Sequence, residues 1–253
     1  MADSPQVTQN TLRAGVVELA FGEPDPALLP VGLIHDAAAE ALGAGGQGAL
    51  AYGSPAGPAQ LRAAIARRAT THEGRVVVAE DILVTGGISQ ALDQVMTMLT
   101  EPGDVVFVEC PTYNLALGII ADHAVTISGI ALDDQGLDVE ALEAAVLAVR
   151  EAGRRPRLVY TIPTFHNPTG TVMTEDRRRE LLEWCAGNRL PMIEDDAYRE
   201  LWLDEPPPLP LKARDQSGTV LYTGTVSKTL AAGLRLGWLA GPEPVVERLG
   251  DVK

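Results

Sequence analysis

The sequence predicts an α/β fold of three layers, in which a mostly parallel sheet is covered by helices on both faces. Short apolar runs alternate along the chain with longer segments whose apolar residues recur at helical spacing, and turn-forming residues separate the two kinds. Strands joined by helices of this length usually run parallel in one sheet. With 253 residues, of which 46% are hydrophobic, the chain is long enough to bury one large core.

The first strand, tight turn and helix are expected near residue 85. The apolar run "DILVT" at 81–85 predicts a strand, and Gly86 and Gly87 predict the turn after it. Residues 88–99 then carry apolar side chains at helical spacing. Pro102 and Gly103 end that helix, and "DVVFV" at 104–108 predicts the next strand.

The same alternation continues to residue 226. Further strands are expected at 124–130, 157–162, 191–195 and 219–226, and further helices at 138–151 and 174–188. The glycine- and alanine-rich stretch at 43–58, which contains Tyr52, is the most loop-like part of the chain.

Composition limits the setting and the partners. The 34 acidic and 20 basic residues give a net charge of −14, so we expect neither nucleic acid nor an anionic membrane as a general partner. No apolar stretch approaches the length of a membrane span. The two cysteines, Cys110 and Cys185, lack metal-ligand spacing and indicate a reducing compartment. A cytoplasmic protein is therefore expected.

Ligands of such sheets bind at the carboxyl ends of the strands, so the residues that follow each strand are candidates for a site. After 81–85, the glycines and the helix start at Ile88 and Ser89 suit a phosphate. A plain turn is the alternative, because neither GxxxxGK nor GxGxxG is present. After 157–162, Asn167 lies in "PTFHNPTG", where a structural Asn-Pro turn is the alternative.

The last two strands are followed by an acid with a phenol and by an amine. Asp195 and Tyr198 stand three residues apart, although Asp195 or Asp196 could instead cap a helix. Lys228, one of three lysines, lies among small and hydroxyl residues. It is either an ordinary surface lysine or a nucleophilic amine in a partly desolvated pocket.

Pyridoxal phosphate uses all of these groups at once. Its aldehyde condenses with a lysine amine, and its pyridine nitrogen needs a buried carboxylate to remain protonated as an electron sink. Its ring oxygen accepts from donors such as an asparagine amide and a tyrosine hydroxyl. Its phosphate is bound by helix-terminal amides, hydroxyls and an arginine. The combination therefore predicts this cofactor more strongly than any one group does.

With these motifs, the sequence resembles the fold-type I, class I/II aminotransferases. The resemblance is strongest to the branch of the 2-aminoadipate aminotransferases and to the aminotransferase-like domains of MocR-type regulators. The matching stretches are "FGEPDPALLP", "AYGSPAGPAQLR", "ILVTGGISQAL", "PTFHNPTG", "IEDDAYREL" and "SKTLAAGLRLGW". They extend from about position 20 to about position 240.

The resemblance implies a role for each matching residue. Lys228 would form the internal aldimine and shuttle the proton, and Asp195 would pair with the pyridinium. The ring oxygen would be held by Asn167 and Tyr198, and Asn167 would also face the substrate. The remaining contacts implied are Tyr113 stacked on the ring, with a core aromatic as the alternative; Ile88, Ser89, Thr225, Ser227 and Arg235 around the phosphate; Tyr52 on the phosphate of a neighbouring subunit; and Gly22 at the substrate carboxylate.

Two departures from the family pattern are visible. Relatives often carry Ser and Gln where this chain has Ile88 and Ser89, so Ile88 offers only its backbone. The smaller C-terminal domain, with the arginine that clamps the substrate carboxylate, would follow "LRLGW", but the sequence ends soon after it. His166 has no role implied beyond packing its loop.

The resemblance therefore implies an N-terminal arm at 1–30 and a pyridoxal phosphate-binding large domain at 31–253 that is incomplete at its C-terminal end. The expected activity is transfer of the amino group of an α-amino acid to a 2-oxo acid, through a Lys228 aldimine and a ping-pong pyridoxamine intermediate. A truncated chain is expected to be poorly active, and a homodimer is expected. The alternatives are an effector-binding module without turnover, as in MocR-type regulators or an inactive fragment, and another reaction such as β-elimination or decarboxylation.

Overall fold

The computed structural model describes residues 15, 22 and 24–252. Most of the arm expected at 1–30 thus lies outside the described residues. The fold is built on an eight-stranded sheet with the strand order β1-β8-β7-β6-β5-β2-β3-β4. Its strands are β1 (Ile82–Thr85), β2 (Val105–Cys110), β3 (Thr126–Asp133), β4 (Gly136–Leu137), β5 (Pro156–Thr161), β6 (Met192–Asp195), β7 (Val220–Thr225) and β8 (Gly237–Ala240).

The centre of the sheet is parallel and its edges are antiparallel. Strands β7, β6, β5, β2 and β3 pair in parallel, whereas β8 is antiparallel to both β7 and β1, and β4 is antiparallel to β3. Because β1 and β7 both run against β8, their carboxyl ends share one edge with those of β6, β5 and β2. The sequence-based prediction of a mostly parallel sheet is confirmed.

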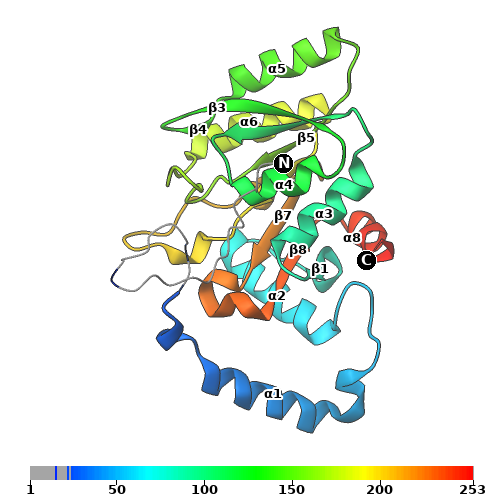
Figure 1. Ribbon diagram of the computed structural model, residues 1–253, viewed down its shortest axis with the longest axis vertical. Coiled ribbons are helices and arrows are strands. Elements are labelled where there is room, and N and C mark those ends of the chain that lie inside the picture. The colour runs from blue at the N-terminus through cyan, green and yellow to red at the C-terminus, as the bar shows by residue number, and fades with distance from the viewer. Residues whose placement is uncertain (1–14, 16–21, 23, 253) are drawn as a thin grey trace.

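Helices cover both faces, as expected (Figure 1). The α-helices are α1 (Val31–Gly45), α2 (Ala59–Glu73), α3 (Ile88–Leu99), α4 (Asn114–Ala121), α5 (Val139–Glu151), α6 (Glu175–Asn188), α7 (Leu211–Arg214) and α8 (Glu243–Asp251). Alternate residues of a strand point to opposite faces. Accordingly, Val106 and Val108 pack in the core beside α3, α4 and α8, whereas Val105 and Phe107 pack beside α5, α6 and α7.

Local sequence signals explain several helix ends. Asp138 caps α5 by accepting from the amide of Ala141 at 3.0 Å, and Thr174 caps α6 by accepting from the amide of Arg177 at 3.3 Å. At α3 the residue before the helix is Gly87, whose φ of 92° is one that other residues rarely adopt. This turn places the start of α3 at the carboxyl end of β1.

The expectation of a loop at 43–58 is wrong for its first half. Residues 43–45 are the end of α1, and the 3-10 helix η2 (Gly46–Leu50) follows it. Helix α1 contains no buried residue and lies apart from the sheet (Figure 1). Among the described residues, no helix has both the length and the apolar character needed to cross a bilayer.

Candidate active site

The candidate residues gather at the edge where the parallel strands end. Asp195 is the last residue of β6 and Thr225 the last residue of β7. Asn167 follows β5, while Ile88 and Ser89 follow β1. Ser227 and Lys228 begin the short π-helical turn η5 (Ser227–Ala231), directly after β7. Residues that are up to 140 positions apart in the sequence therefore meet because their strands share one edge.

Asp195 and Asp196 have different surroundings despite being neighbours. Asp195 is 7% exposed and accepts a hydrogen bond at 2.7 Å from the hydroxyl of Tyr160, on β5. Burial raises the pKa of Asp195 to about 6, and the hydrogen bond from Tyr160 opposes this rise. Asp196 instead pairs with Arg199 in the interior. Of these two aspartates, Asp195 is therefore the one whose carboxylate is available to a ligand at the strand ends, whereas that of Asp196 is used by Arg199.

Asn167 and Tyr198 are brought together by two separate loops. The Asn167 amide Nδ2 lies 3.4 Å from the Tyr198 hydroxyl and donates to it. Burial raises the pKa of Tyr198, so this hydroxyl stays protonated at neutral pH. Lys228 approaches the same tyrosine, with Nζ 5.7 Å from the centre of its ring, and donates at 2.9 Å to the carbonyl of Gly22. The amine, the amide, the phenol and Gly22 thus form one cluster.

Beside this cluster, the backbone forms a cradle suited to an anion. The first amides of α3, at Ile88 and Ser89, belong to a helix N-terminus and so have no partner within the helix. Arg235 reaches the turn before them, with Nη2 3.3 Å from the carbonyl of Gly86. A Cβ atom at Gly87 would lie 2.6 Å from this guanidinium, so a larger residue there would displace the guanidinium from the turn.

The hydroxyls of Thr225 and Ser227 lie 2.8 Å apart, and that of Thr225 also contacts the carbonyl of Leu236 at 2.8 Å. Tyr113 stands half-buried immediately before α4, packed against the core, and burial raises its pKa. Tyr52 is fully exposed on the segment between η2 and α2. In a single chain the structure therefore does not bury Tyr52 among the other candidate residues.

Two buried polar groups near the site were not singled out for it from the sequence. Tyr160 is one, and Glu109, near the end of β2, is the other. Glu109 accepts from the hydroxyl of Thr161 at 2.6 Å and from the amide of Ile162 at 2.8 Å. The sequence signal for both residues was a polar side chain within an otherwise apolar strand. Such a side chain needs a hydrogen-bond partner when it is buried.

His166 packs the loop that carries Asn167. Its Nε2 lies 3.1 Å from Glu109, and its Nδ1 contacts the hydroxyl of Thr169 at 2.9 Å. Its backbone amide donates to the carbonyl of Thr171 at 2.8 Å. These contacts join one end of the loop to the other and fit the packing role expected for His166.

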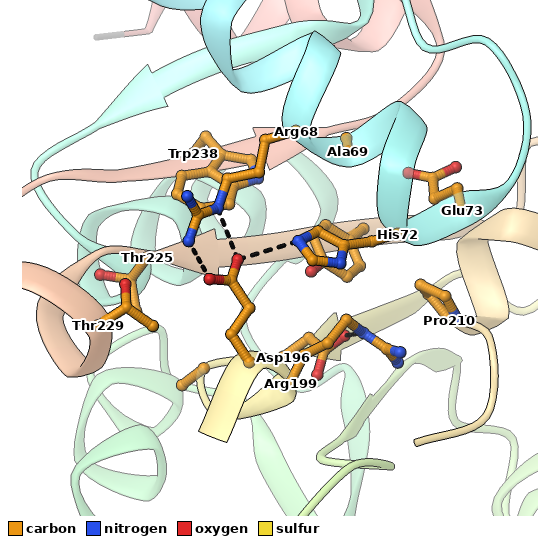
Figure 2. A pocket seen from close by; sticks show the side chains of 13 residues that line it. Arg68, Ala69, His72, Glu73, Asp196, Arg199, Pro210, Thr225, Thr229 and Trp238 are labelled. Carbon is orange, nitrogen blue, oxygen red and sulfur yellow. Dashed lines mark hydrogen bonds and ion pairs between the residues drawn. The ribbon is translucent and has the colours of Figure 1, made fainter. Parts of the chain in front are cut away.

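A small hollow is lined by Thr225 and Thr229, which flank Lys228 in the sequence, and by residues of α2. There Arg68 and His72 both contact the carboxylate of Glu200, which links α2 to the 3-10 helix η4 (Arg199–Leu201) (Figure 2). The hollow measures about 20 Å³, room for about one water molecule. The hollow is therefore too small to hold a cofactor. The contacts of Glu200 with Arg68 and His72 instead fix the segment after Tyr198 to α2.

Comparisons with known proteins place this chain in a family. Residues 14–253 match the family model of aminotransferase class I and II. The chain is 39% identical to the HTH-type transcriptional regulator YisV of Bacillus subtilis, covering 98% of this chain and 49% of the regulator. It is 38% identical to aromatic-amino-acid aminotransferase 1 of Thermococcus litoralis, covering 94% of this chain and 57% of that enzyme.

A solved structure agrees in fold. The α-aminoadipate aminotransferase LysN of Thermus thermophilus, complexed with N-(5'-phosphopyridoxyl)-L-leucine, superposes with a TM-score of 0.83 at 32% identity, covering 92% of this chain and 58% of that one. The chain spans about half the length of the curated relatives that it matches. By the match of its sequence and the agreement of its fold, the chain belongs to the class I and II aminotransferases.

Proposed function

We propose that this chain forms the pyridoxal phosphate site of an aminotransferase, which moves the amino group of an α-amino acid to a 2-oxo acid. The observation that best supports this proposal is the cluster of side chains at the carboxyl ends of the strands. It contains a buried carboxylate at Asp195, an amine at Lys228 against the ring of Tyr198, and an anion cradle at the start of α3. The agreement with a solved aminotransferase that carries a phosphopyridoxyl group supports the proposal.

The residues fit this cofactor group by group. Asp195 is buried and accepts from the hydroxyl of Tyr160, whereas Asp196 pairs with Arg199, so the carboxylate of Asp195 suits a pyridinium nitrogen. The paired donors Asn167 and Tyr198 suit the ring oxygen. The phosphate would be bound by the amides of Ile88 and Ser89, the hydroxyls of Thr225 and Ser227, and Arg235, around a turn where a Cβ at Gly87 would fill the space.

When bound, pyridoxal phosphate supplies an electron sink that stabilises negative charge at the α carbon of an amino acid. Lys228 Nζ would hold the cofactor's aldehyde and carry the proton taken from that carbon. Asp195 would keep the pyridine nitrogen protonated, while Tyr113 would cover a face of the ring. Gly22, whose carbonyl lies 2.9 Å from Lys228 Nζ, would line the substrate side.

The substrates are proposed only as a class. One relative is named for aromatic amino acids and the similar solved structure for α-aminoadipate, so the same framework serves different side chains. What they share is an α-amino acid and the corresponding 2-oxo acid. The choice among side chains depends on residues other than the shared cluster.

We further infer that the active form is a homodimer. Helix α1 buries none of its side chains within the described chain, and Leu28, Val31, Leu33, Leu42 and Leu50 are exposed on α1 and its flanks. An exposed apolar helix of this kind is stable in water only when another surface covers it. A second copy would cover α1 and bring the exposed Tyr52 to the phosphate site of its neighbour.

The test of the proposed function is covalent capture at Lys228. Protein loaded with pyridoxal phosphate and treated with borohydride should carry the label on the peptide that contains Lys228, and Lys228→Ala should bind the cofactor only noncovalently. Lys212, buried and hydrogen-bonded to the carbonyl of Val220, is the matched lysine that should stay unlabelled. A label on Lys212, or one that survives Lys228→Ala, would refute the assignment.

A single-turnover assay across a panel of amino acids then separates turnover from binding. Conversion of the bound cofactor to its amine form supports an aminotransferase. Cofactor binding at Lys228 without any conversion would favour an effector-binding module, the alternative suggested by the regulator among its relatives.

A further inference from the structure

Tyr160 is the one polar residue of its strand segment that is both fully buried and bonded to a proposed cofactor ligand. It is 0% exposed on β5, with its ring among the apolar side chains of the core next to α3 and α4. Its hydroxyl donates at 2.7 Å to Oδ2 of Asp195. A buried hydroxyl without an acceptor would destabilise the folded protein. The hydrogen bond to Asp195 avoids this cost and is therefore stable in the interior.

The sheet register explains how the two residues meet. In the parallel pair of β5 and β6, Tyr160 stands opposite Ile193 and Thr161 opposite Glu194. Asp195 is two positions beyond Ile193, so it lies on the same face as Tyr160 and one step nearer the carboxyl edge. The long tyrosine side chain spans that step along the same face of the sheet and reaches the carboxylate of Asp195.

We propose that Tyr160 is a positioning residue for the proposed cofactor site: its hydroxyl fixes the carboxylate of Asp195 in one orientation, so that the oxygen not bound to Tyr160 faces the cofactor's pyridine nitrogen. This inference rests on the proposed function. Tyr160 itself touches neither substrate nor cofactor and acts through Asp195.

The electrostatics of the site agree with this role. Burial, followed by the charge of Asp195, raises the pKa of Tyr160 well above its usual value, so the hydroxyl remains a donor across the working pH range. Burial raises the pKa of Asp195 to about 6, and the bond from Tyr160 is the largest influence that lowers it. Without Tyr160, the pKa of Asp195 would lie closer to neutral pH, and a smaller fraction of its carboxylate would be ionised to pair with a pyridinium.

Other charged and titratable groups also face Asp195 and must be held constant in any test. They come from every element packed around it: Asp196 on its own strand, Glu109 on β2, Tyr113 before α4, and Tyr198 with Lys228 near its ring. Of these, Asp196 and Glu109 raise the pKa of Asp195, so Tyr160 works against both.

The experiment compares Tyr160→Phe with Tyr222→Phe. Tyr222 is also buried, on the neighbouring strand β7, but it packs in a different part of the core, beside α2. In apoprotein labelled with ¹³C at aspartate carboxyls, the Asp195 signal is assigned by its loss in Asp195→Asn. Tyr160→Phe should raise the pKa of Asp195 by about one to two units, the worth of a hydrogen bond to a charged group. Tyr222→Phe should leave it unchanged.

Cofactor affinity supplies a second readout. Tyr160→Phe should weaken binding of pyridoxal phosphate about two- to tenfold at pH 7, because a rise of about one to two units from a pKa of about 6 lowers the ionised fraction of Asp195 by that factor. This loss should shrink at pH 9, where most of Asp195 is ionised in both proteins. In the Asp195→Asn background, Tyr160→Phe should have no further effect. An unchanged Asp195 pKa in Tyr160→Phe, or an affinity loss that is equal at both pH values, overturns the inference. Failure of the unsubstituted protein to bind pyridoxal phosphate would instead overturn the proposed function, and the carboxyl titration would still be readable.

Discussion

At the scale of single residues, the neighbours Asp195 and Asp196 should respond to the same substitution in opposite ways. Asp195→Asn should leave pyridoxal phosphate bound but slow proton abstraction from an amino acid on the order of 10²- to 10³-fold, the usual cost of removing one electrostatic stabiliser. Asp196→Asn should spare that rate and cost stability instead, since it leaves Arg199 unpaired in the interior. Single-turnover rates and urea unfolding of both variants separate the two effects. Equal rate losses would mean that the roles of the two residues were confused.

The raised pKa of Asp195 also predicts how stability changes with pH. Its pKa of about 6 in the fold lies above the ordinary value of 3.8, so between these values the folded state binds more protons than the unfolded state. The contribution of Asp195 to the free energy of unfolding therefore falls as pH rises from about 4 to about 6, by up to about 3 kcal/mol for two pKa units. Cofactor-free Asp195→Asn should lose this part of the decline, measured by urea unfolding at a series of pH values. A pH profile identical to that of the unsubstituted protein would contradict it.

The sequence could point to several residues that the structure brings together in the candidate site, but not to their buried partners. Some signals are local and can be recognised without knowledge of the fold. Examples are the three-residue spacing of Asp195 and Tyr198 and the hydroxyl residues just before Lys228. Tyr160 is different, because its partner is 35 positions away and is chosen by the register of β5 and β6. A sequence shows that such a hydroxyl must be satisfied when it is buried, but not which acceptor satisfies it.

At the scale of elements, α6 is fixed to the sheet by a guanidinium that no water reaches. Arg178 is 0% exposed, donates to the carbonyl of Pro163 at 2.6 Å and to the hydroxyl of Thr164 at 2.9 Å, and lies 3.8 Å from Glu194. Thr164 also accepts from Arg199 at 3.1 Å. One hydroxyl thus connects α6, the loop of Asn167 and the segment that follows Tyr198.

Removing this guanidinium should be costly for stability. Arg178→Met leaves Glu194 buried with its main charge partner gone, and we expect a loss of about 3 to 5 kcal/mol in the free energy of unfolding. Arg179 is the matched control, because it is adjacent, exposed and paired with the exposed Asp176, and Arg179→Met should change stability by no more than about 0.5 kcal/mol. Urea unfolding measures both. Similar small losses in the two variants would show that Glu194 is satisfied without Arg178.

The elements that the alternating pattern predicted are present, and the departures have a tertiary cause. The strand near "LRLGW" falls at β8 and runs antiparallel between β1 and β7. Its place depends on close packing: a Cβ at Gly224 on β7 would lie 2.4 Å from the indole of Trp238 on β8. Such a fit between residues of two strands has no periodic signal in the sequence. The end of α1 at residues 43–45 was expected to be loop because glycine disfavours a helix, although the alanines of the same segment favour one.

At the scale of the whole molecule, the apolar surface of α1 predicts the state of association. The protein should sediment as a dimer, and Leu33→Glu should shift it toward the monomer, because a charge on the covered face opposes burial. Val76→Glu is the matched control: Val76 is 76% exposed and Leu33 63%, but Val76 lies in the connection between α2 and β1. Sedimentation velocity over a range of concentrations compares the three proteins. An unchanged dimer in Leu33→Glu would mean that α1 is covered by something else.

Association and cofactor binding should be coupled through Tyr52. If this exposed tyrosine completes the phosphate site of a neighbouring copy, Tyr52→Phe should weaken binding of pyridoxal phosphate about tenfold or more while the protein remains a dimer, because a hydrogen bond to a charged group is lost. Leu33→Glu should weaken binding at least as much, since a monomer has no neighbour to supply the hydroxyl. In the monomeric background, Tyr52→Phe should then cost nothing more, and fluorescence titration of all four proteins measures this cycle. A monomer that binds the cofactor as tightly as the dimer would show that each chain completes its own site, and that Tyr52 serves no neighbour.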